Sequence, residues 1–431
     1  MITILKRIVP ASIKEGLVRL KTTTINNWRK RNLALKMRAK HFQLLTKLKN
    51  KESITVVFIV IHKSVWKVDS IFKRMLKDDF FEPIILICPY VSYGTENAFE
   101  SMEDAFSFFS SKGYPVVSSY NYKEGNWLSL EDLNTDIVFF TNPHNLTRRE
   151  YYESAYFNYL TCYVPYSHDI SRYNNYQTQY NQFFHNAMWK IFAPHHEDLE
   201  IFREYSQAKA SNVVVTGYPA GEGFFLKLGN NPWKEQEKSK LKIIWAPHHT
   251  IDGGDLMLST FLHYAEHFMN IVKSYEDKVQ FAFKPHPILK SKLYNLPGWG
   301  RKKTDDYYKF WEEEKNTQLE DGDYEDLFRW SDGMIHDSGS FLAEYHYVKK
   351  PVLYLCNANV EQFLNPFGIS ALRSCKKGYD INDIIKFIES LLAGDLMHDD
   401  KFYINHVNPY FVNEMPSEKI INIIKSECRI K

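Results

Sequence analysis

Three apolar runs in the second half of the chain each end in a polar cluster that contains histidine. The runs lie at residues 243–246, 281–283 and 334–335, and the clusters that follow are Pro247-His248-His249, Lys284-Pro285-His286 and His336-Asp337-Ser338. In an open α/β sheet, ligands bind outside the carboxyl ends of the strands, so these three ends are expected to converge on one site. Imidazole, ammonium and hydroxyl groups together indicate an anionic phosphate ligand.

The third cluster continues as Asp337-Ser338-Gly339-Ser340, a turn between an apolar run and a helical stretch. Free backbone N–H groups and the positive end of a helix bind phosphate, hydroxyls add donors, and glycine lets a ligand approach closely. We therefore expect this turn to hold a diphosphate. An ordinary helix cap is the alternative, and for this turn taken alone it is the more common use.

Lys284-Pro285-His286-Pro287 is the most specific of the clusters. Two prolines remove two donors from any continuing strand, so the strand must end there and His286 must project from its tip. A fixed imidazole suits phosphate binding or acid–base chemistry, whereas a histidine in an incidental turn is the alternative.

His248 and His249 also follow an apolar run, and either could contact the phosphates. A zinc site is the rival interpretation, but adjacent histidines point in different directions and the sequence offers no obvious third ligand. We therefore predict no metal at this position.

Strand-like and helical stretches alternate along most of the chain, which predicts an α/β fold. Before residue 240 the strand-like runs lie at 54–61, 83–88, 115–117, 136–140, 160–164, 190–193 and 212–215. The pattern then restarts, with runs at 242–246, 279–283, 333–336 and 351–355. We expect two Rossmann-like domains at residues 53–235 and 236–405, between a basic helical extension at 1–52 and a C-terminal helix at 406–431.

The composition is that of a folded protein of 431 residues, 44% hydrophobic and 25% charged. Five widely spaced cysteines form no C-x-x-C pair, which fits a reducing compartment. No stretch reaches the ~20 apolar residues needed to span a bilayer and no signal-peptide pattern opens the chain, so we expect a cytoplasmic protein. Neither a P-loop nor a G-x-G-x-x-G fingerprint occurs, and no cofactor is predicted.

Charge is distributed unevenly along the chain. Residues 1–52 hold fourteen Lys or Arg against Glu15 and Glu52, a net charge of +12, and the remainder carries −10. This segment mixes aliphatic residues and Trp28 with its basic residues, as helices on anionic membrane surfaces do, which would place the protein on the inner face of the cell membrane. A solvated helix packed on the neighbouring domain is an equal alternative. Nucleic acid is not expected as a partner, because no recognised motif accompanies the charge.

Further motifs accompany the three clusters. They are Val215-Thr216-Gly217-Tyr218-Pro219, Gly322-Asp323-Tyr324-Glu325-Asp326-Leu327-Phe328 and Lys349-Lys350-Pro351-Val352-Leu353-Tyr354. From about Pro194 to Leu355, the clusters and motifs together resemble the CDP-glycerol glycerophosphotransferase family, whose enzymes prime or polymerise teichoic acids and related capsular polymers. The family's D-x-S-S appears as Asp337-Ser338-Gly339-Ser340, and its Thr-Trp-Arg is replaced by His248-His249-Thr250.

The resemblance implies a GT-B arrangement, in which two Rossmann-like domains face each other across a cleft. It implies an enzyme that moves glycerol phosphate or a similar polyol phosphate from a CDP-linked donor to a hydroxyl of a cell-surface glycan or lipid-linked acceptor, releasing CMP. One alternative is a GT-B glycosyltransferase that uses a nucleotide sugar in capsule or surface polysaccharide synthesis. The other is a non-catalytic, membrane-associated scaffold with the same fold.

The resemblance also implies residue roles. The family's base is a histidine of the N-terminal domain, for which His168 is the nearest candidate and His62 and His144 are rivals. His286 is expected to be catalytic and, with Lys284, Ser338 and Ser340, to hold the diphosphate. His248, His249, Asp337 and Gly339 complete the expected donor site, and Glu344 is expected to reach the ribose hydroxyls.

Overall fold

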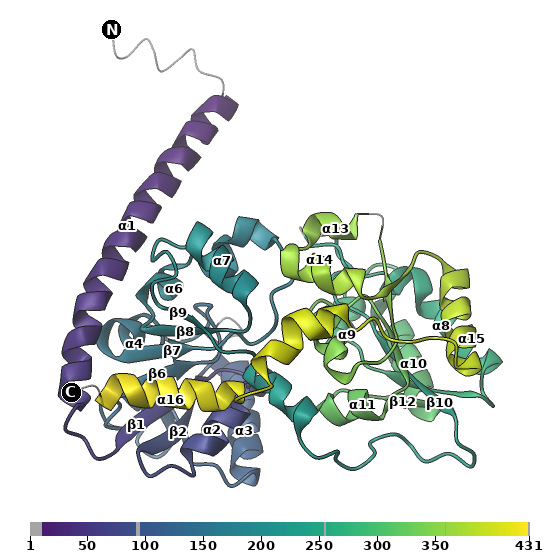
Figure 1. Cartoon of the computed structure of the whole chain (residues 1–431), viewed down its shortest axis with the longest axis horizontal. Helices are drawn as coiled ribbons and strands as arrows, with labels where there is room; N and C mark the ends of the chain where they lie inside the picture. Colours follow the sequence, from purple (N-terminus) through teal and green to yellow (C-terminus); the bar gives the residue numbers. More distant parts are fainter. Residues whose placement is uncertain (1–10, 92–94, 254–255, 358, 430–431) are drawn as a thin grey trace. The chain divides into compact units, whose positions relative to one another are not determined.

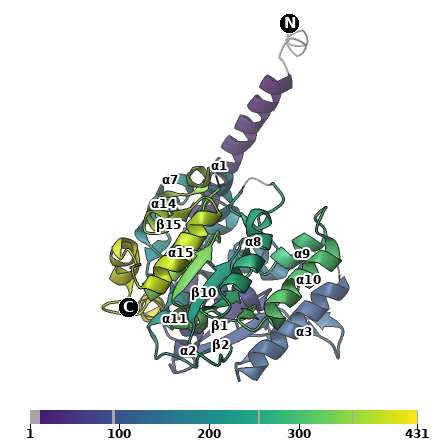
Figure 2. The same ribbon diagram turned by 90° about the vertical axis from the view of Figure 1, so that its right-hand side faces the viewer.

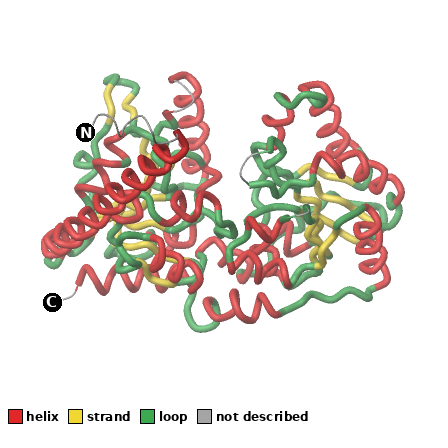
Figure 3. The backbone as a smooth tube through the Cα atoms, turned by 90° about the horizontal axis from the view of Figure 1, so that it is seen from above, coloured by secondary structure: helices red, strands yellow, loops and turns green. Residues whose placement is uncertain are grey.

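The computed structural model describes residues 11–91, 95–253, 256–357 and 359–429, and the chain forms two compact units (Figure 1). The first unit contains the described residues up to Tyr166, residues 176–216 and those from Ser417 onward. The second unit contains residues 167–175 and 217–416. Each unit is built around its own parallel sheet, and helices surround the strands in both (Figure 3).

The first sheet has seven parallel strands in the order β3-β2-β1-β6-β7-β8-β9. They are β1 (Ile54–Val60), β2 (Phe81–Ile87), β3 (Val116–Ser118), β6 (Ile137–Phe140), β7 (Leu160–Tyr163), β8 (Lys190–Ala193) and β9 (Val213–Val215). All seven residues of β1 are buried, and β1 pairs with β2 on one side and β6 on the other. A continuous apolar, β-branched run is what a strand covered on both faces requires.

Helices lie on both faces of this sheet. Val56 and Phe58 of β1 belong to one buried cluster, whereas Val57 and Ile59 belong to another, because alternate residues of a strand point to opposite faces. The helices of the first unit are α1 (Ala11–Leu48), α2 (Asp69–Met75), α3 (Thr95–Ser111), α4 (Glu153–Asn158), α5 (Gln177–Tyr180), α6 (Phe183–Ala187), α7 (His196–Tyr205) and α16 (Pro416–Arg429). Ile420 of α16 is fully buried in the first cluster, so the end of the chain completes this core.

The second sheet has six parallel strands in the order β12-β11-β10-β13-β14-β15. They are β10 (Leu241–Ala246), β11 (Val279–Phe283), β12 (Thr317–Leu319), β13 (Gly333–His336), β14 (Val352–Leu355) and β15 (Lys376–Gly378). Its helices are α8 (Phe261–Ser274), α9 (Leu289–Tyr294), α10 (Gly300–Glu313), α11 (Glu325–Trp330), α12 (Phe341–Glu344), α13 (Val360–Phe363), α14 (Pro366–Arg373) and α15 (Ile381–Ala393). Figure 2 shows α8 and α15 beside β10.

The core of the second unit is aromatic. Trp245 of β10 stacks on Phe268 of α8, with ring centroids 3.8 Å apart, and lies 5.5 Å from Trp311 of α10. On the other face of the sheet, Ile244 packs with Phe328 of α11. Large rings buried on both faces hold the strands, and therefore the strand ends, in fixed positions.

The predicted α/β fold with parallel sheets is confirmed. The strands predicted by apolar runs are present within one or two residues of their expected bounds, whereas β12, β15 and the short antiparallel pair β4 (Tyr120–Asn121) and β5 (Asn126–Trp127) were not predicted. These missed strands have only two or three residues each and contain no continuous apolar run. Among the described residues, no helix combines the length and the apolar character that crossing a bilayer requires.

Candidate functional site

The three polar clusters lie side by side at the carboxyl edge of the second sheet. Their strands β11, β10 and β13 are neighbours in that order and run parallel. The backbone N–H of His286 donates to the carbonyl of Pro247 at 3.1 Å, and the backbone N–H of His248 donates to the Asp337 carboxylate. The predicted convergence of the three strand ends is therefore confirmed.

Three imidazoles meet at this edge, a group that we call the histidine cluster: His248, His249 and His286. His248 is buried and the other two are half-buried. The ring centroid of His249 lies 4.3 Å from that of His248 and 4.1 Å from that of His286. The sequence offered no third ligand to the adjacent pair, and the structure supplies one in His286. Among the residues that the structure describes, these three are therefore the ones that could hold a metal ion.

Hydrogen bonds indicate which ring nitrogens of the histidine cluster carry protons. The backbone N–H of Ile288 donates to Nδ1 of His286 at 3.3 Å, so the proton of the neutral ring sits on Nε2. Thr250 Oγ1 lies 3.0 Å from Nδ1 of His248 and already accepts two backbone N–H groups, so its own proton points to that nitrogen. Both rings therefore present an Nε2–H donor, which suits an anionic ligand.

Burial keeps the histidine cluster uncharged at neutral pH. Desolvation, with smaller effects of His249 and Lys292, lowers the pKa of His286 to about 3. Desolvation and Lys292 lower the pKa of His249 to about 4, and the pKa of His248 also lies well below its usual value. The cluster is thus a set of neutral hydrogen-bond donors and not a set of positive charges.

The turn after β13 lies against the histidine cluster. His336 is fully buried, and its Nδ1 accepts the backbone N–H of Ser338 at 3.2 Å, which holds the turn in place. A side chain at Gly339 would come 3.7 Å from Nε2 of His248, so glycine leaves the space beside this imidazole open. In the part of the chain that the structure describes, no acceptor faces the backbone N–H groups of Gly339 and Ser340. The turn and the imidazole therefore offer hydrogen-bond donors next to each other.

Asp337 is buried in the turn and connects it to two loops. One carboxylate oxygen accepts the backbone N–H of His248, and the other accepts both the backbone N–H and the hydroxyl of Thr260, the latter at 2.8 Å. Burial raises the pKa of Asp337 to about 6, although these donors act in the opposite direction. Asp337 therefore positions the site through the backbone of its neighbours.

Two other predicted donor contacts, Lys284 and Glu344, already have protein partners. Lys284 is buried, and its ammonium donates to the carbonyl of Gly322 at 2.7 Å, in the loop before α11. Glu344 is 3% exposed and accepts a short hydrogen bond from the hydroxyl of Tyr324. For either side chain to contact a nucleotide, it must share or exchange these bonds.

The segment 167–175 packs in the second unit, although the strands on either side of it, β7 and β8, belong to the first. Asn365 holds the segment: its backbone N–H donates to the carbonyl of Ile170 at 2.9 Å, and its side chain donates to the carbonyl of Asp169 at 2.7 Å. A Cβ at Gly368 would lie 2.5 Å from the same Ile170 oxygen, so α14 and the segment are in close contact.

His168 lies on this segment and is 4% exposed. Its Nε2 is 3.1 Å from the hydroxyl of Tyr347, and its ring centroid is 4.4 Å from that of Tyr218 and 5.4 Å from that of Phe367. Tyr347 belongs to the short 3-10 helix Tyr345–Val348, which continues α12. The residue predicted as the base therefore contacts the helical segment that begins at the turn after β13.

The two rival bases, His62 and His144, follow β1 and β6, which are neighbours in the first sheet. Both rings are half-buried, and burial lowers the pKa of each. The His62 ring lies 4.9 Å from that of Tyr90, and the Gln182 amide donates to Nδ1 of His144 at 3.2 Å. Both histidines therefore lie at the carboxyl edge of the first sheet, in a different unit from His168.

Three residues that shape the site were given no individual role by the sequence: His336, Thr260 and Tyr324. His336 is the last residue of β13, and its fully buried ring lies edge-on to Tyr354. Thr260 and Tyr324 act through contacts with residues distant in the sequence, which no local pattern reveals. For His336, only its position in the third polar cluster indicated that it lies at the site.

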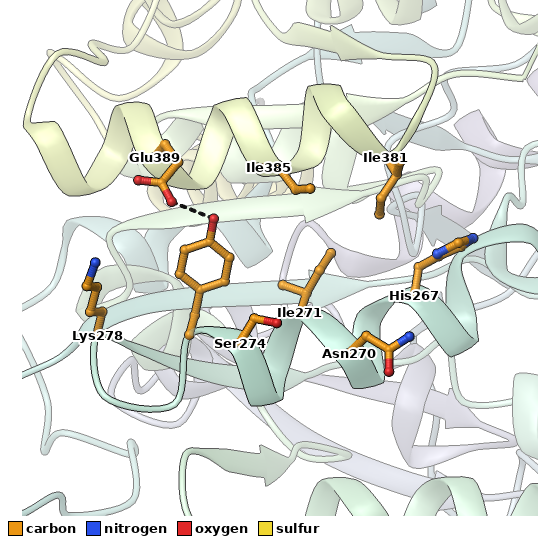
Figure 4. A pocket seen from close by; sticks show the side chains of 9 residues that line it. His267, Asn270, Ile271, Ser274, Lys278, Ile381, Ile385 and Glu389 are labelled. Carbon is orange, nitrogen blue, oxygen red and sulfur yellow. Dashed lines mark hydrogen bonds between the residues drawn. The ribbon is translucent and has the colours of Figure 1, made fainter.

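A separate hollow of about 410 Å³ lies between α8 and α15 (Figure 4). Its lining includes His267, Ile271, Tyr275 and Ile385, and the Tyr275 hydroxyl donates to Glu389 at 2.6 Å. None of the predicted site residues lines it. The hollow is therefore distinct from the strand-end site.

Two Rossmann-like units, each built around a parallel sheet, define a GT-B-like α/β protein. Residues 165–361 match the family described as CDP-Glycerol:Poly(glycerophosphate) glycerophosphotransferase. The matched segment contains His168, the histidine cluster and the turn after β13. The predicted family resemblance is confirmed by this match, and with it the predicted class, a transferase. No curated protein matches the chain.

Solved structures of similar fold include two classes of protein. The wall teichoic acid polymerase TagF is 14% identical, with a TM-score of 0.53, and the alignment covers 94% of this chain and 98% of TagF. The UDP-GlcNAc 2-epimerase of Methanocaldococcus jannaschii is 16% identical, with a TM-score of 0.55 and coverage of 86% and 99%. MnaA of S. aureus gives 16% identity, a TM-score of 0.53 and coverage of 86% and 96%. These similarities establish a shared fold.

Proposed function

We propose that this protein transfers glycerol phosphate, or a similar polyol phosphate, from a CDP-linked donor to a hydroxyl of a cell-surface glycan or lipid-linked acceptor, releasing CMP. The observation that carries the proposal is the group of adjacent neutral donors at the ends of β10, β11 and β13, inside the segment that matches the glycerophosphotransferase family. TagF, a polymerase of similar fold, has been soaked with CDPG.

The proposed reaction is an in-line displacement at the phosphorus next to the polyol. The acceptor hydroxyl attacks this phosphorus, the P–O bond to the CMP phosphate breaks, and a base takes the hydroxyl proton. His168 is the proposed base, because its segment contacts Tyr347 on the helical extension of the phosphate-binding turn. No metal or cofactor is needed in this scheme.

The histidine cluster would stabilise charge on the diphosphate and on the departing CMP. His286 and His248 each present an Nε2–H, and Gly339 and Ser340 add backbone N–H groups. Preorganised donors of this kind contribute ~2–4 kcal/mol each to lowering a barrier, since they need no reorganisation as charge develops.

Nucleotide release tests the proposed reaction. Purified protein would be incubated with CDP-glycerol, CDP-ribitol, and several UDP- and CMP-linked sugars, in the presence of a lipid-linked glycan acceptor. We expect CMP release from a CDP-polyol alone. Release from a sugar nucleotide alone would establish the glycosyltransferase alternative, and no release from any donor would favour the non-catalytic scaffold.

The base is tested by three matched substitutions, His168→Asn, His62→Asn and His144→Asn. Loss of a general base lowers kcat by about 10²–10⁴-fold, so His168→Asn should show this loss with little change in the KM for the CDP-linked donor. The other two variants should stay within a few-fold of wild type. A large kcat loss in His62→Asn or His144→Asn alone would transfer the role to that residue.

We also propose that α1 attaches the protein to an anionic membrane surface on the cytoplasmic side. One side of α1 packs on the first unit through Met37, His41 and Leu48. Another side exposes large apolar side chains at helical spacing: Ile25, Trp28, Leu35 and Phe42 are 39, 64, 62 and 71% exposed. Basic residues flank this apolar stripe, namely Arg29, Arg31, Lys36 and Arg38. An apolar stripe between basic rows suits a bilayer of anionic lipids.

Vesicle sedimentation tests this attachment. Wild-type protein should bind vesicles of phosphatidylglycerol and phosphatidylcholine, should bind pure phosphatidylcholine weakly, and should be released by salt. A variant with Trp28→Ser, Leu35→Ser and Phe42→Ser should lose binding. Val412→Ser, at a position 62% exposed in the second unit, is the control and should bind as wild type does. Equal binding by all three proteins would contradict the proposal.

A further inference from the structure

We infer that the histidine cluster, His248, His249 and His286, is also a binding site for a divalent transition-metal ion of the zinc class. The inference goes beyond phosphate transfer, which uses these rings as hydrogen-bond donors. One ring nitrogen from each histidine lies within 4.8 Å of the other two, at the tips of two neighbouring strands. Among the residues that the structure describes, this is the one group of three potential metal ligands so placed.

The spacing of the three rings suits a small ion. Zn²⁺ binds imidazole nitrogen at about 2.0–2.1 Å, so its ligand atoms lie roughly 3–3.5 Å from one another. His249 and His286 are half-buried residues of loops that follow β10 and β11, and small rotations of their side chains bring the nitrogens to that separation. Three histidines leave a fourth position open for an exchangeable ligand.

His249 carries the nitrogen that is least committed to the protein. Its Nδ1 is buried and has no hydrogen-bond partner among the described residues. A buried polar atom without a partner is costly, and a metal bond would remove that cost. By contrast, Nδ1 of His248 and Nδ1 of His286 already have partners in Thr250 and Ile288. His249 is therefore the residue whose removal should affect metal binding most specifically.

The ligand set selects a class of ion. The cluster offers imidazole nitrogens and contains no carboxylate. Imidazole favours Zn²⁺, Co²⁺, Ni²⁺ and Cu²⁺, whereas Mg²⁺ and Ca²⁺ prefer oxygen ligands. The site should therefore discriminate strongly against Mg²⁺.

Metal and diphosphate would use the same rings in opposite ways. A phosphate oxygen accepts the Nε2–H of His286, whereas a metal at that nitrogen needs its lone pair, so the ring proton must move to Nδ1. That move breaks the hydrogen bond from the Ile288 N–H. We therefore expect the metal to compete with the CDP-linked donor, and this part of the inference rests on the proposed function.

Titration with Co²⁺ tests the metal site in the full chain after treatment with a chelator. Four-coordinate Co²⁺ absorbs visible light strongly, and wild-type protein should show this absorption with one ion per chain. His249→Ala should weaken binding by about a hundredfold. The control is a double variant, His263→Ala with His267→Ala, which removes a histidine pair on α8 whose ring centroids lie 6.3 Å apart, and it should bind Co²⁺ as wild type does.

His249→Asn, checked for an unchanged thermal unfolding midpoint, separates loss of a ligand from loss of folding. Wild-type protein without visible Co²⁺ absorption would overturn the metal site. Absorption that survives in His249→Ala and disappears in the α8 double variant would also overturn it.

Addition of CDP-glycerol to the Co²⁺-loaded protein tests the competition. We expect the absorption to fall as the nucleotide displaces the ion. Unchanged absorption at a saturating CDP-glycerol concentration, in protein that turns CDP-glycerol over, would overturn the competition. Protein that binds Co²⁺ through His249 but turns over no CDP-polyol would contradict the proposed function and leave the metal site standing.

Discussion

The residues next to His286 in the sequence predict where its ring lies but not its charge state. The prolines on both sides of it end β11, and its ring projects at the strand tip beside His249, as the pattern predicts. The charge state of the ring was not predictable, because the loss of solvent that lowers its pKa comes from residues distant in the sequence. Similarly, no local pattern shows that the Lys284 ammonium is bound to Gly322.

Replacement of His286 by alanine should lower kcat/KM for the CDP-linked donor about 10²–10³-fold, since one preorganised donor to the diphosphate is removed. Initial rates of CMP release measure this change. His263→Ala is the control, because His263 is exposed on α8, and it should leave the rate unchanged. A His286→Ala enzyme with near wild-type kcat/KM would contradict the assignment.

The KM for the CDP-linked donor should stay constant within about twofold from roughly pH 6 to pH 8. The pKa values of His286 and His249 lie at about 3 and about 4, so both rings remain neutral donors throughout this interval. An imidazolium ligand with an ordinary pKa would instead lose its proton here, and KM would rise steeply with pH. Donor KM measured at several pH values distinguishes the two cases.

Asp337 should make the free energy of unfolding fall as pH rises. Its pKa is raised to about 6 in the folded protein, above the value of ~3.9 in an unfolded chain, so the folded state binds the proton more tightly. The resulting stabilisation is fully present below about pH 4 and is lost as pH rises through 6, a change of about 3 kcal/mol.

Urea unfolding at pH values across this interval measures the effect of Asp337. The wild-type slope should disappear in Asp337→Asn and persist in Asp321→Asn, the control at an exposed loop position. A slope that is the same in wild type and Asp337→Asn would show that Asp337 does not have a raised pKa.

At the scale of elements, apolar runs predicted every strand of the first sheet and the four inner strands of the second, and missed β12 and β15 at the edges of the second sheet. β1 and β10 are apolar along nearly their whole length, whereas β15 reads Lys376-Lys377-Gly378 and has no apolar side chain. The position of the segment 167–175 was also not predictable, because its carbonyl groups accept hydrogen bonds from the backbone and the side chain of Asn365, which is distant in the sequence.

Gly368→Ala should displace the segment that carries His168. A Cβ at this position would lie 2.5 Å from the carbonyl oxygen of Ile170, too close for a backbone atom to accommodate without a shift. We expect a loss of about 1–3 kcal/mol in the free energy of unfolding and about a tenfold fall in kcat.

Chemical denaturation and initial rates of CMP release measure the two effects. Gly322→Ala is the control, because no atom lies within 4 Å of its added Cβ and its φ is not positive. If Gly368→Ala kept the wild-type kcat, the docking of this segment would have no role in catalysis.

At the scale of the whole molecule, each unit combines segments that are far apart in the sequence. The hydrophobic core of the first unit is completed by α16 from the end of the chain, and the second unit takes in residues 167–175 from between β7 and β8. Alternating strands and helices predict two parallel sheets, but they do not show that a segment packs in a different unit from its neighbours in the sequence. The concentration of basic charge in residues 1–52 is, in contrast, directly visible in the sequence.

A crystal structure of the protein with CDP-glycerol tests the central claim most directly. The claim is that the ends of β10, β11 and β13 bind the diphosphate of a CDP-linked donor. We predict electron density for the diphosphate within hydrogen-bonding distance, about 3 Å, of His286 Nε2 and of the backbone N–H groups of Gly339 and Ser340. Density for the nucleotide in the hollow between α8 and α15, or at the edge of the first sheet, would contradict the account.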